Sequence, residues 1–93
     1  NKISTKNNFF TFKCDITKET QVKKTVKKII KKFKKIDILI NNAGSKSSSL
    51  RNFYDKFESY KMKTWKEVID VNLNSVFLLS QEISKYMIKE KKG

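Results

Sequence analysis

An almost continuous apolar run, Ile36-Asp37-Ile38-Leu39-Ile40, ends directly at Asn41-Asn42-Ala43-Gly44. A run of this length with so few polar positions is typical of a parallel strand that is covered on both faces, rather than of a half-exposed strand. Parallel sheets of this kind occur in α/β proteins, where helices cover both faces. The run therefore predicts a buried strand whose carboxyl end carries a turn of polar and small residues.

A second strand-like segment lies near the start of the chain. Phe9-Phe10-Thr11-Phe12-Lys13-Cys14 is rich in aromatic and other β-favouring residues, and it is bounded by Asn7-Asn8 and by Asp15. This pattern predicts another strand.

Helical spacing dominates the stretch between the two segments. Thr17 is a suitable N-cap, and Glu19 lies in the first turn. Lysines cover the rest of the surface, which favours a helix packed on a sheet with a solvated outer face over a helix that lies on a membrane. Strand, helix and strand together match one βαβ unit with a right-handed crossover. The apolar stripe of the helix consists of Val22, Val26, Ile29, Ile30 and Phe33.

Residues 45–63 form a long connection, and four of its first five residues are serines. Connections of this length in compact domains are usually functional lids or disordered segments. The aromatic residues at positions 53, 54, 57 and 60 recur at about one helical turn. We expect them to pack a short helix, and a substrate cage is the alternative.

A long helix follows the connection. Thr64-Trp65-Lys66-Glu67 fits a capping box, so the helix is expected to begin at Trp65, to run toward Glu90 and to end by Gly93. Two apolar edges suggest that it packs on the sheet and also on a partner helix. The core-facing stripe is Trp65, Val68, Ile69, Leu73, Val76, Phe77, Ser80, Ile83 and Met87, and the second edge is Val71, Leu78 and Tyr86.

Composition excludes several classes of protein. With 93 residues the chain makes at most one small domain, and it contains no histidine, one cysteine (Cys14) and two glycines. Zinc-finger, haem and Ser-His-Asp sites are therefore excluded, as are glycine-rich phosphate loops and an internal disulfide, and no metal site is expected. No apolar run approaches the length of a membrane span. The chain begins at Asn1 without an export leader, so we expect a cytoplasmic protein and an incomplete sequence.

The formal net charge of +13 raises the possibility of a nucleic-acid or acidic-lipid partner. Only one of the 22 basic residues, Arg51, is an arginine, although arginine is favoured for bidentate grip of phosphate and for base readout. The joint abundance of lysine, asparagine and isoleucine is what an A+T-rich coding sequence produces. We therefore expect a solvated lysine face, with neither nucleic acid nor membrane as a partner.

Ligands of open α/β sheets bind just beyond the carboxyl ends of the strands. Two segments fall at that edge: Asp15-Ile16 after the first strand, and residues 41–44 after the second. Aspartate and asparagine offer polar groups there, and small residues let the backbone approach a ligand. The same residue types also favour simple turns and helix caps, and this alternative remains open.

Asn72 is a third candidate. Helical spacing from Ile69 and Val76 points its side chain toward the core stripe. A buried amide needs partners, because an unpaired one costs about 1–3 kcal/mol. A functional role and a purely structural tie are both compatible with this position.

Three motifs in this order resemble the middle of a classical short-chain dehydrogenase/reductase. They are Cys-Asp-Ile-Thr at 14–17, Asp-Ile-Leu-Ile-Asn-Asn-Ala-Gly at 37–44, and Trp65 followed by Asn-Leu at 72–73. The resemblance covers nearly the whole chain. It implies an α/β fold, with residues 1–93 forming the central part of one NAD(P)-binding domain. That domain would be a doubly wound, Rossmann-type parallel sheet, represented here by strand, helix and strand followed by a long helix.

The resemblance also implies roles for individual residues. Asp15 matches the acidic position at the adenine ring of NAD or NADP, with Ile16 in apolar contact beside it. Asn42, Ala43 and Gly44 match the segment along the ribose of the cofactor, and Asn41 the residue that ties neighbouring strands. Asn72 matches the helix asparagine of the catalytic tetrad, which holds a water in a proton relay.

The whole enzyme would transfer a hydride between the nicotinamide and a carbonyl or alcohol substrate, of the 3-oxoacyl-carrier-protein or the sugar type. It would form a homo-oligomer through the Trp65–Glu90 helix. A small basic binding module for nucleic acid or acidic lipid is the alternative.

The chain also departs from the family pattern. It lacks the glycine-rich turn, and none of its tyrosines is followed four residues later by the required lysine. Lys34 stands where a glycine is common, and the connection to Trp65 is several residues longer than in simple acyl-carrier-protein reductases. We therefore expect an internal fragment that is inactive by itself.

Overall fold

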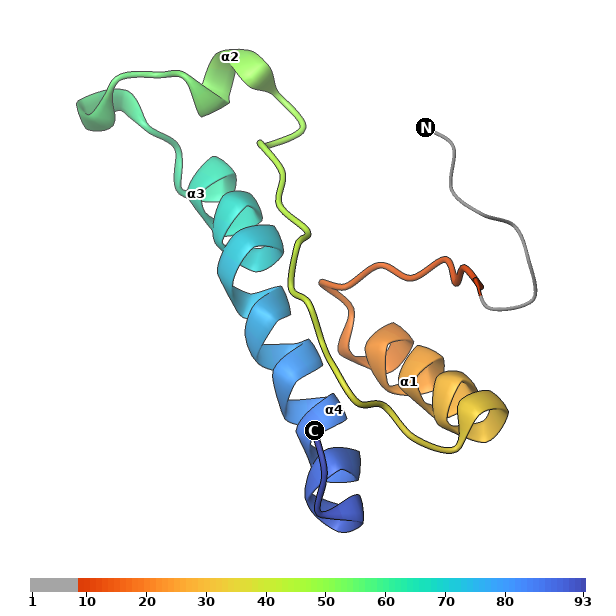
Figure 1. Ribbon diagram of the computed structural model, residues 1–93. Coiled ribbons are helices and arrows are strands. Elements are labelled where there is room, and N and C mark those ends of the chain that lie inside the picture. Colours follow the sequence, from red (N-terminus) through yellow and green to blue (C-terminus); the bar gives the residue numbers. More distant parts are fainter. Residues whose placement is uncertain (1–8) are drawn as a thin grey trace.

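The computed structural model describes residues 9–93, and Figure 1 shows their arrangement. The predicted boundary at Asn7-Asn8 lies outside these residues. Every regular element within them is helical. In chain order the elements are α1 (Glu19–Phe33), α2 (Leu50–Phe53), the 3-10 turn η1 (Phe57–Ser59), α3 (Met62–Ile69), the π-helical turn η2 (Asp70–Asn74) and α4 (Ser75–Glu90).

The two predicted strands are not formed between residues 9 and 93. Residues 9–14 and 36–40 follow a plain trace in Figure 1. A strand exists only within a hydrogen-bonded ladder, so each segment needs a neighbour. In a doubly wound sheet of order 3-2-1-4, the third and fourth strands are separated by two others. Segments that hold those two places cannot pair with each other.

Helix α1 forms where the sequence predicts it, with Glu19 in its first turn. Its N-cap is Lys18 rather than the predicted Thr17, and no side chain caps it, because the Thr17 hydroxyl bonds to Asp15 instead. The helix ends at Lys34, which has a φ of 72° and donates its N–H to the carbonyl of Ile30. The position therefore has the left-handed conformation that glycine adopts most easily.

Helices α3, η2 and α4 follow one another without a break and form one rod, seen in cyan to blue in Figure 1. The rod ends at Glu90, as predicted. It begins at Met62, three residues before the predicted start, so the capping-box prediction is wrong. Thr64 lies inside the helix with only 4% of its surface exposed, and the Glu67 carboxylate binds Ser48 instead of a cap.

The hydrophobic core lies in the contact between α1 and α4. Val22 and Val26 of α1 and Ile83 of α4 are almost fully buried. Ile36 and Leu39 of the extended segment pack against the same cluster. Because crossovers are right-handed, a doubly wound sheet places the helices before and after its fourth strand on the same face. The contact between α1 and α4 agrees with that topology.

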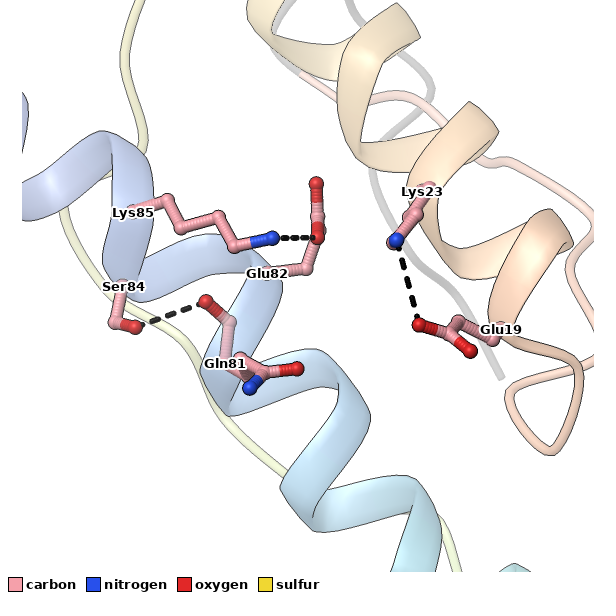
Figure 2. A network of polar contacts seen from close by, with 6 residues as sticks. All are labelled: Glu19, Lys23, Gln81, Glu82, Ser84 and Lys85. Atoms are coloured by element: carbon pink, nitrogen blue, oxygen red, sulfur yellow. Dashed lines mark hydrogen bonds and ion pairs between the residues drawn. The ribbon is translucent and has the colours of Figure 1, made fainter.

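The contact between α1 and α4 also has a polar part. Figure 2 shows Glu82 on the side of α4 that faces α1, where Lys23 lies. Glu82 is largely buried and accepts a hydrogen bond from Lys85 at 3.0 Å, whereas Lys23 pairs with Glu19 at 3.3 Å. Each charge therefore has a partner on its own helix.

Much of the predicted core stripe of the rod is exposed. Trp65, Leu73 and Phe77 each show more than half of their surface, and Ile38 and Ile40 of the extended segment show nearly four-fifths. The prediction that the whole stripe faces a core is wrong for this chain. The α1–α4 contact covers only the part of the rod near Ile83.

The connection contains the short helix α2 and the turn η1 rather than one helix packed by aromatic residues. Phe53 and Tyr54 contact each other edge to face, but Phe57 is 93% exposed. None of the described helices is long and apolar enough to cross a membrane.

Candidate functional site

The polar turn after residues 36–40 lies along the rod. The Asn41 side-chain amide donates to the Ser80 hydroxyl at 3.3 Å, and Ser45 bonds to Asn72. Four extended residues cover about 13 Å, and eight helical residues cover about 12 Å. The two contacts therefore fix residues 41–45 as an extended segment that runs antiparallel to the rod, as the yellow-green trace in Figure 1 shows.

Asn72 binds the backbone of Ser45 at two points. Its Oδ1 accepts the Ser45 N–H at 3.1 Å, and its Nδ2 donates to the Ser45 carbonyl at 2.7 Å. Nδ2 also donates to the carbonyl of Val68 at 2.9 Å. Both amide hydrogens are thus used on backbone carbonyls, and Oδ1 keeps one lone pair.

The π-helical turn η2 sets the position of Asn72. Within it, the Ser75 N–H reaches back to the carbonyl of Asp70, five residues earlier. The Ser75 hydroxyl donates to the carbonyl of Val71, just as Asn72 donates to Val68. Side chains therefore supply hydrogen bonds to two carbonyls around the widened turn. Turns of this kind occur often at functional sites.

Gly44 lies against the same amide. A Cβ at this position would come within 2.9 Å of Asn72 Oδ1, closer than a carbon and an oxygen tolerate. The glycine is thus required by the close approach of the turn to the rod.

The structure corrects one prediction about Asn72 and leaves another open. Asn72 is exposed, so the prediction that its side chain is buried in the core stripe is wrong. Its predicted hydrogen bonds to backbone are present, at Ser45 and Val68. Whether Asn72 also serves a proton relay remains a prediction.

Asp15 organises a separate turn before α1. Its Oδ1 accepts the Thr17 N–H at 3.0 Å and the Thr17 hydroxyl at 2.6 Å, and its own N–H donates to Gln21. The hydrogen bonds from Thr17 hold the pKa of the Asp15 carboxyl below its ordinary value, and nearby Lys18 acts in the same direction. The carboxylate is exposed and ionised at neutral pH, and Ile16 beside it packs against the core cluster.

The fold thus joins residues 42–44 to Asn72 at one edge, with Asn42, Ala43 and Gly44 all exposed. Among residues 9–93, no hydrogen bond connects this group to Asp15. The arrangement offers an ionised carboxylate and an accessible stretch of backbone, which suits a polar ligand with several hydroxyl and amide groups. The described part of the chain contains no cluster of three or more potential metal ligands.

Sequence reasoning missed three residues at this edge. Ser45 is the backbone partner of Asn72, and Ser48 donates its N–H and its hydroxyl to Glu67 Oε1 at 3.1 and 3.3 Å. The only signal was the run of serines directly after Gly44. Glu67 was assigned to a capping box, because a local motif cannot reveal a partner 19 residues away.

Comparisons with known proteins agree on one family. A family profile described as short chain dehydrogenase matches residues 1–93. The 3-oxoacyl-[acyl-carrier-protein] reductase FabG of Buchnera aphidicola subsp. Baizongia pistaciae is 40% identical over 88 residues, which is 95% of this chain and 34% of that protein.

Solved structures show the same fold. NAD⁺-bound xylitol dehydrogenase matches with a TM-score of 0.77 and 29% identity over 88% of this chain and 30% of its own. A metagenomic short-chain oxidoreductase in complex with NADP matches with a TM-score of 0.77 and 26% identity over 88% of this chain and 35% of its own. The chain therefore spans about a third of the length of these relatives.

Proposed function

Because the chain belongs to the short-chain dehydrogenase family, we propose that it forms the central part of an NAD(P)-dependent oxidoreductase. The observation that carries the proposal is the tie between residues 44–45 and Asn72, which joins the two family motifs at one edge. Residues 9–14 and 36–40 are proposed as the third and fourth strands of the complete doubly wound sheet.

The residues present fit a dinucleotide at this edge. Asn42, Ala43 and Gly44 are exposed, and the small residues at 43 and 44 leave the backbone accessible for contact along a ribose. Asp15 is exposed and ionised, and it would accept hydrogen bonds from the exocyclic amine of an adenine, with Ile16 beside the ring. When bound, NADH or NADPH would supply the hydride, and the oxidised dinucleotide would accept it.

The chain's own residues would bind and position the dinucleotide rather than take part in the chemical step. The amide of Asn72 holds Ser45 and Val68, so it fixes the turn against the rod and has no hydrogen left to donate to a water. Asn72 is thus a positioning residue in this proposal, and any contact to a relay water is limited to Oδ1 or to its backbone. The acid/base tyrosine and its lysine are not part of these 93 residues.

For the substrate and the assembly we propose only a general class. The substrate is a small carbonyl or alcohol compound. The exposed apolar side chains of the rod, among them Leu73 and Phe77, support a homo-oligomer that buries the Trp65–Glu90 helix. The relatives reported above are reductases and dehydrogenases, and they favour this function over a small basic binding module.

Calorimetric titration of the full-length protein with NADH and NADPH tests the proposal. We expect saturable binding of at least one of them, weakened about tenfold or more by Asp15→Ala. Glu58→Ala is the control, because Glu58 is an exposed carboxylate outside the motifs at 14–17 and 37–44, and it is expected to leave the affinity unchanged. The proposal fails if neither dinucleotide binds, and DNA binding with a steep salt dependence would favour the basic module.

A further inference from the structure

Residues 45–49, called the strap below, stay beside the rod. Ser45 is held by Asn72, and Ser48 donates its N–H and its hydroxyl to Glu67 Oε1 at 3.1 and 3.3 Å. Three extended residues cover about 10 Å, and the five helical residues from Asn72 back to Glu67 cover about 7.5 Å. The strap therefore continues the antiparallel path of the polar turn along the rod, as Figure 1 shows.

The other two serines of the strap also have hydrogen-bond partners. Ser47 is 5% exposed, and its hydroxyl donates to the Ser49 carbonyl at 2.7 Å. The Ser49 hydroxyl accepts the Asn52 N–H at 3.2 Å and so caps α2. The strap is thus held along its whole length, from the tie at Asn72 to the start of α2.

The strap follows the proposed cofactor edge directly. In a doubly wound fold the dinucleotide crosses the point where the strand order reverses, and the fourth strand belongs to the second half of the sheet. Asp15, after the third strand, is proposed at the adenine, so residues 42–44, after the fourth strand, would lie in the nicotinamide half. The strap begins at the next residue. It would therefore border the nicotinamide end, where the substrate exchanges a hydride with the ring.

We propose that Glu67 is a positioning residue for the reaction and acts through Ser48 and the strap. Its half-buried carboxylate accepts two hydrogen bonds on one oxygen, and such charge-assisted bonds are stronger than neutral ones. A strap released at Ser48 would still be held at Ser45 by Asn72. The release would thus disturb the nicotinamide end and leave the adenine end in place. This inference rests on the proposed function.

Steady-state kinetics of the full-length protein test this role. Two probes cover the proposed substrate classes, ethyl acetoacetate for 3-oxoacyl compounds and D-fructose for sugars, and the one that is reduced faster is used. Glu67→Leu removes the acceptor and is expected to lower kcat/KM about tenfold, because small displacements near the reacting atoms are costly. The dinucleotide affinity should stay unchanged.

Two milder variants show whether the hydrogen bonds carry the effect. Glu67→Gln keeps a side-chain oxygen that can accept both bonds, so it should retain most of the activity. Ser48→Ala removes only the hydroxyl donor and keeps the N–H, so it should lower kcat/KM about threefold. Glu58→Leu is the matched control, because Glu58 is an exposed glutamate of the same connection outside the strap. It should leave kcat/KM unchanged.

A second readout needs no substrate. The fluorescence of bound NADH or NADPH depends on the surroundings of the nicotinamide ring. We expect the emission to change in Glu67→Leu and to match the unsubstituted protein in Glu67→Gln and Glu58→Leu. If neither probe is reduced, the emission alone decides, and if Glu67→Leu does not fold, Ser48→Ala takes its place.

The outcomes separate this role from the proposed function. Unchanged kcat/KM in a folded Glu67→Leu protein that binds the dinucleotide normally overturns the positioning role and leaves the oxidoreductase intact. A lower melting temperature with unchanged kcat/KM and emission has the same meaning, because Glu67 is then a structural tie alone. A loss in Glu67→Gln as large as in Glu67→Leu overturns the hydrogen-bonded clamp. A protein that binds neither dinucleotide overturns the proposed function, and the positioning role falls with it.

Discussion

Asn72 holds the backbone of Ser45 from both sides, accepting its N–H at 3.1 Å and donating to its carbonyl at 2.7 Å. A side-chain amide used in this way replaces the two hydrogen bonds that a neighbouring backbone would supply. The extended segment therefore remains fixed to the rod just after Gly44.

Removing this amide is the first test. Asn72→Leu keeps the size of the side chain but removes its hydrogen bonds to Ser45, which is exposed to water, so we expect the full-length protein to lose about 1 kcal/mol of unfolding free energy. If Asn72 also positions the relay, kcat measured on folded protein should fall about 100-fold.

Asn74→Leu is the control for this substitution. Asn74 is an exposed asparagine in the same turn, and among the described residues its side chain bonds only to that of Asp70, at 2.8 Å. Asn74→Leu should therefore change the unfolding free energy and kcat only slightly. Normal kcat in a destabilised Asn72→Leu protein would leave Asn72 with a structural role alone.

Gly44→Ala tests the close approach of the turn to the rod. The new Cβ would lie 2.9 Å from Asn72 Oδ1, so the turn must shift, at a cost of about 1–3 kcal/mol in unfolding free energy. In an Asn72→Ala background the obstructing oxygen is gone, and Gly44→Ala should then cost much less. Denaturant unfolding of the four proteins in this double-mutant cycle measures the coupling, and additive effects would contradict it.

Lys34→Gly is expected to stabilise the protein by about 1 kcal/mol, because Lys34 has the left-handed conformation that costs a side-chain-bearing residue about that much. Its φ is 72° at the end of α1. Lys35→Gly next to it should give no gain, since Lys35 has no positive φ. Thermal unfolding of the two variants distinguishes them, and equal melting temperatures would refute the assignment.

The turn at Asp15 predicts a pH effect with a definite sign. Hydrogen bonds from Thr17 lower the pKa of the folded-state carboxyl, so the turn adds stability at neutral pH. That contribution begins to fall as the pH drops through the unfolded pKa of about 3.9, and it is lost once the pH passes the lower folded pKa. Thr17→Val should raise the pKa of Asp15 in an NMR titration, and Thr20→Val, which alters a neighbouring exposed threonine, should not.

The 93-residue chain by itself is expected to aggregate or stay partly unfolded. Among residues 9–93 the buried apolar core is limited to Val22, Val26 and Ile83, while Ile38 and Ile40 are nearly four-fifths exposed. Replacing both exposed isoleucines by lysine should reduce light scattering. The same change at Ile36 and Leu39, which pack on the core cluster, should instead unfold the chain further. Cooperative thermal unfolding of a soluble monomer would contradict this expectation.

The helices follow mainly from local pattern. The helical spacing of Val22 and Val26 predicted α1, and the apolar stripe predicted a long helix that ends at Glu90. The motifs at 14–17, 37–44 and 65–73 indicated the family from the sequence alone, because their order and spacing depend only on the chain. Hydrophobic periodicity and motif spacing are properties of neighbouring residues, and they need no long-range contact to be recognised.

Tertiary contacts decided the rest. The predicted strands did not form between residues 9 and 93, because a strand depends on a partner that a local pattern cannot supply. Glu67 accepts a hydrogen bond from Ser48 instead of forming the predicted helix cap. Asn72 bonds to Ser45 instead of lying in the predicted core. These hydrogen bonds join residues that are 19 and 27 positions apart in the sequence. A polar side chain takes whichever partner the folded chain brings within about 3 Å, and only the three-dimensional path determines which one that is.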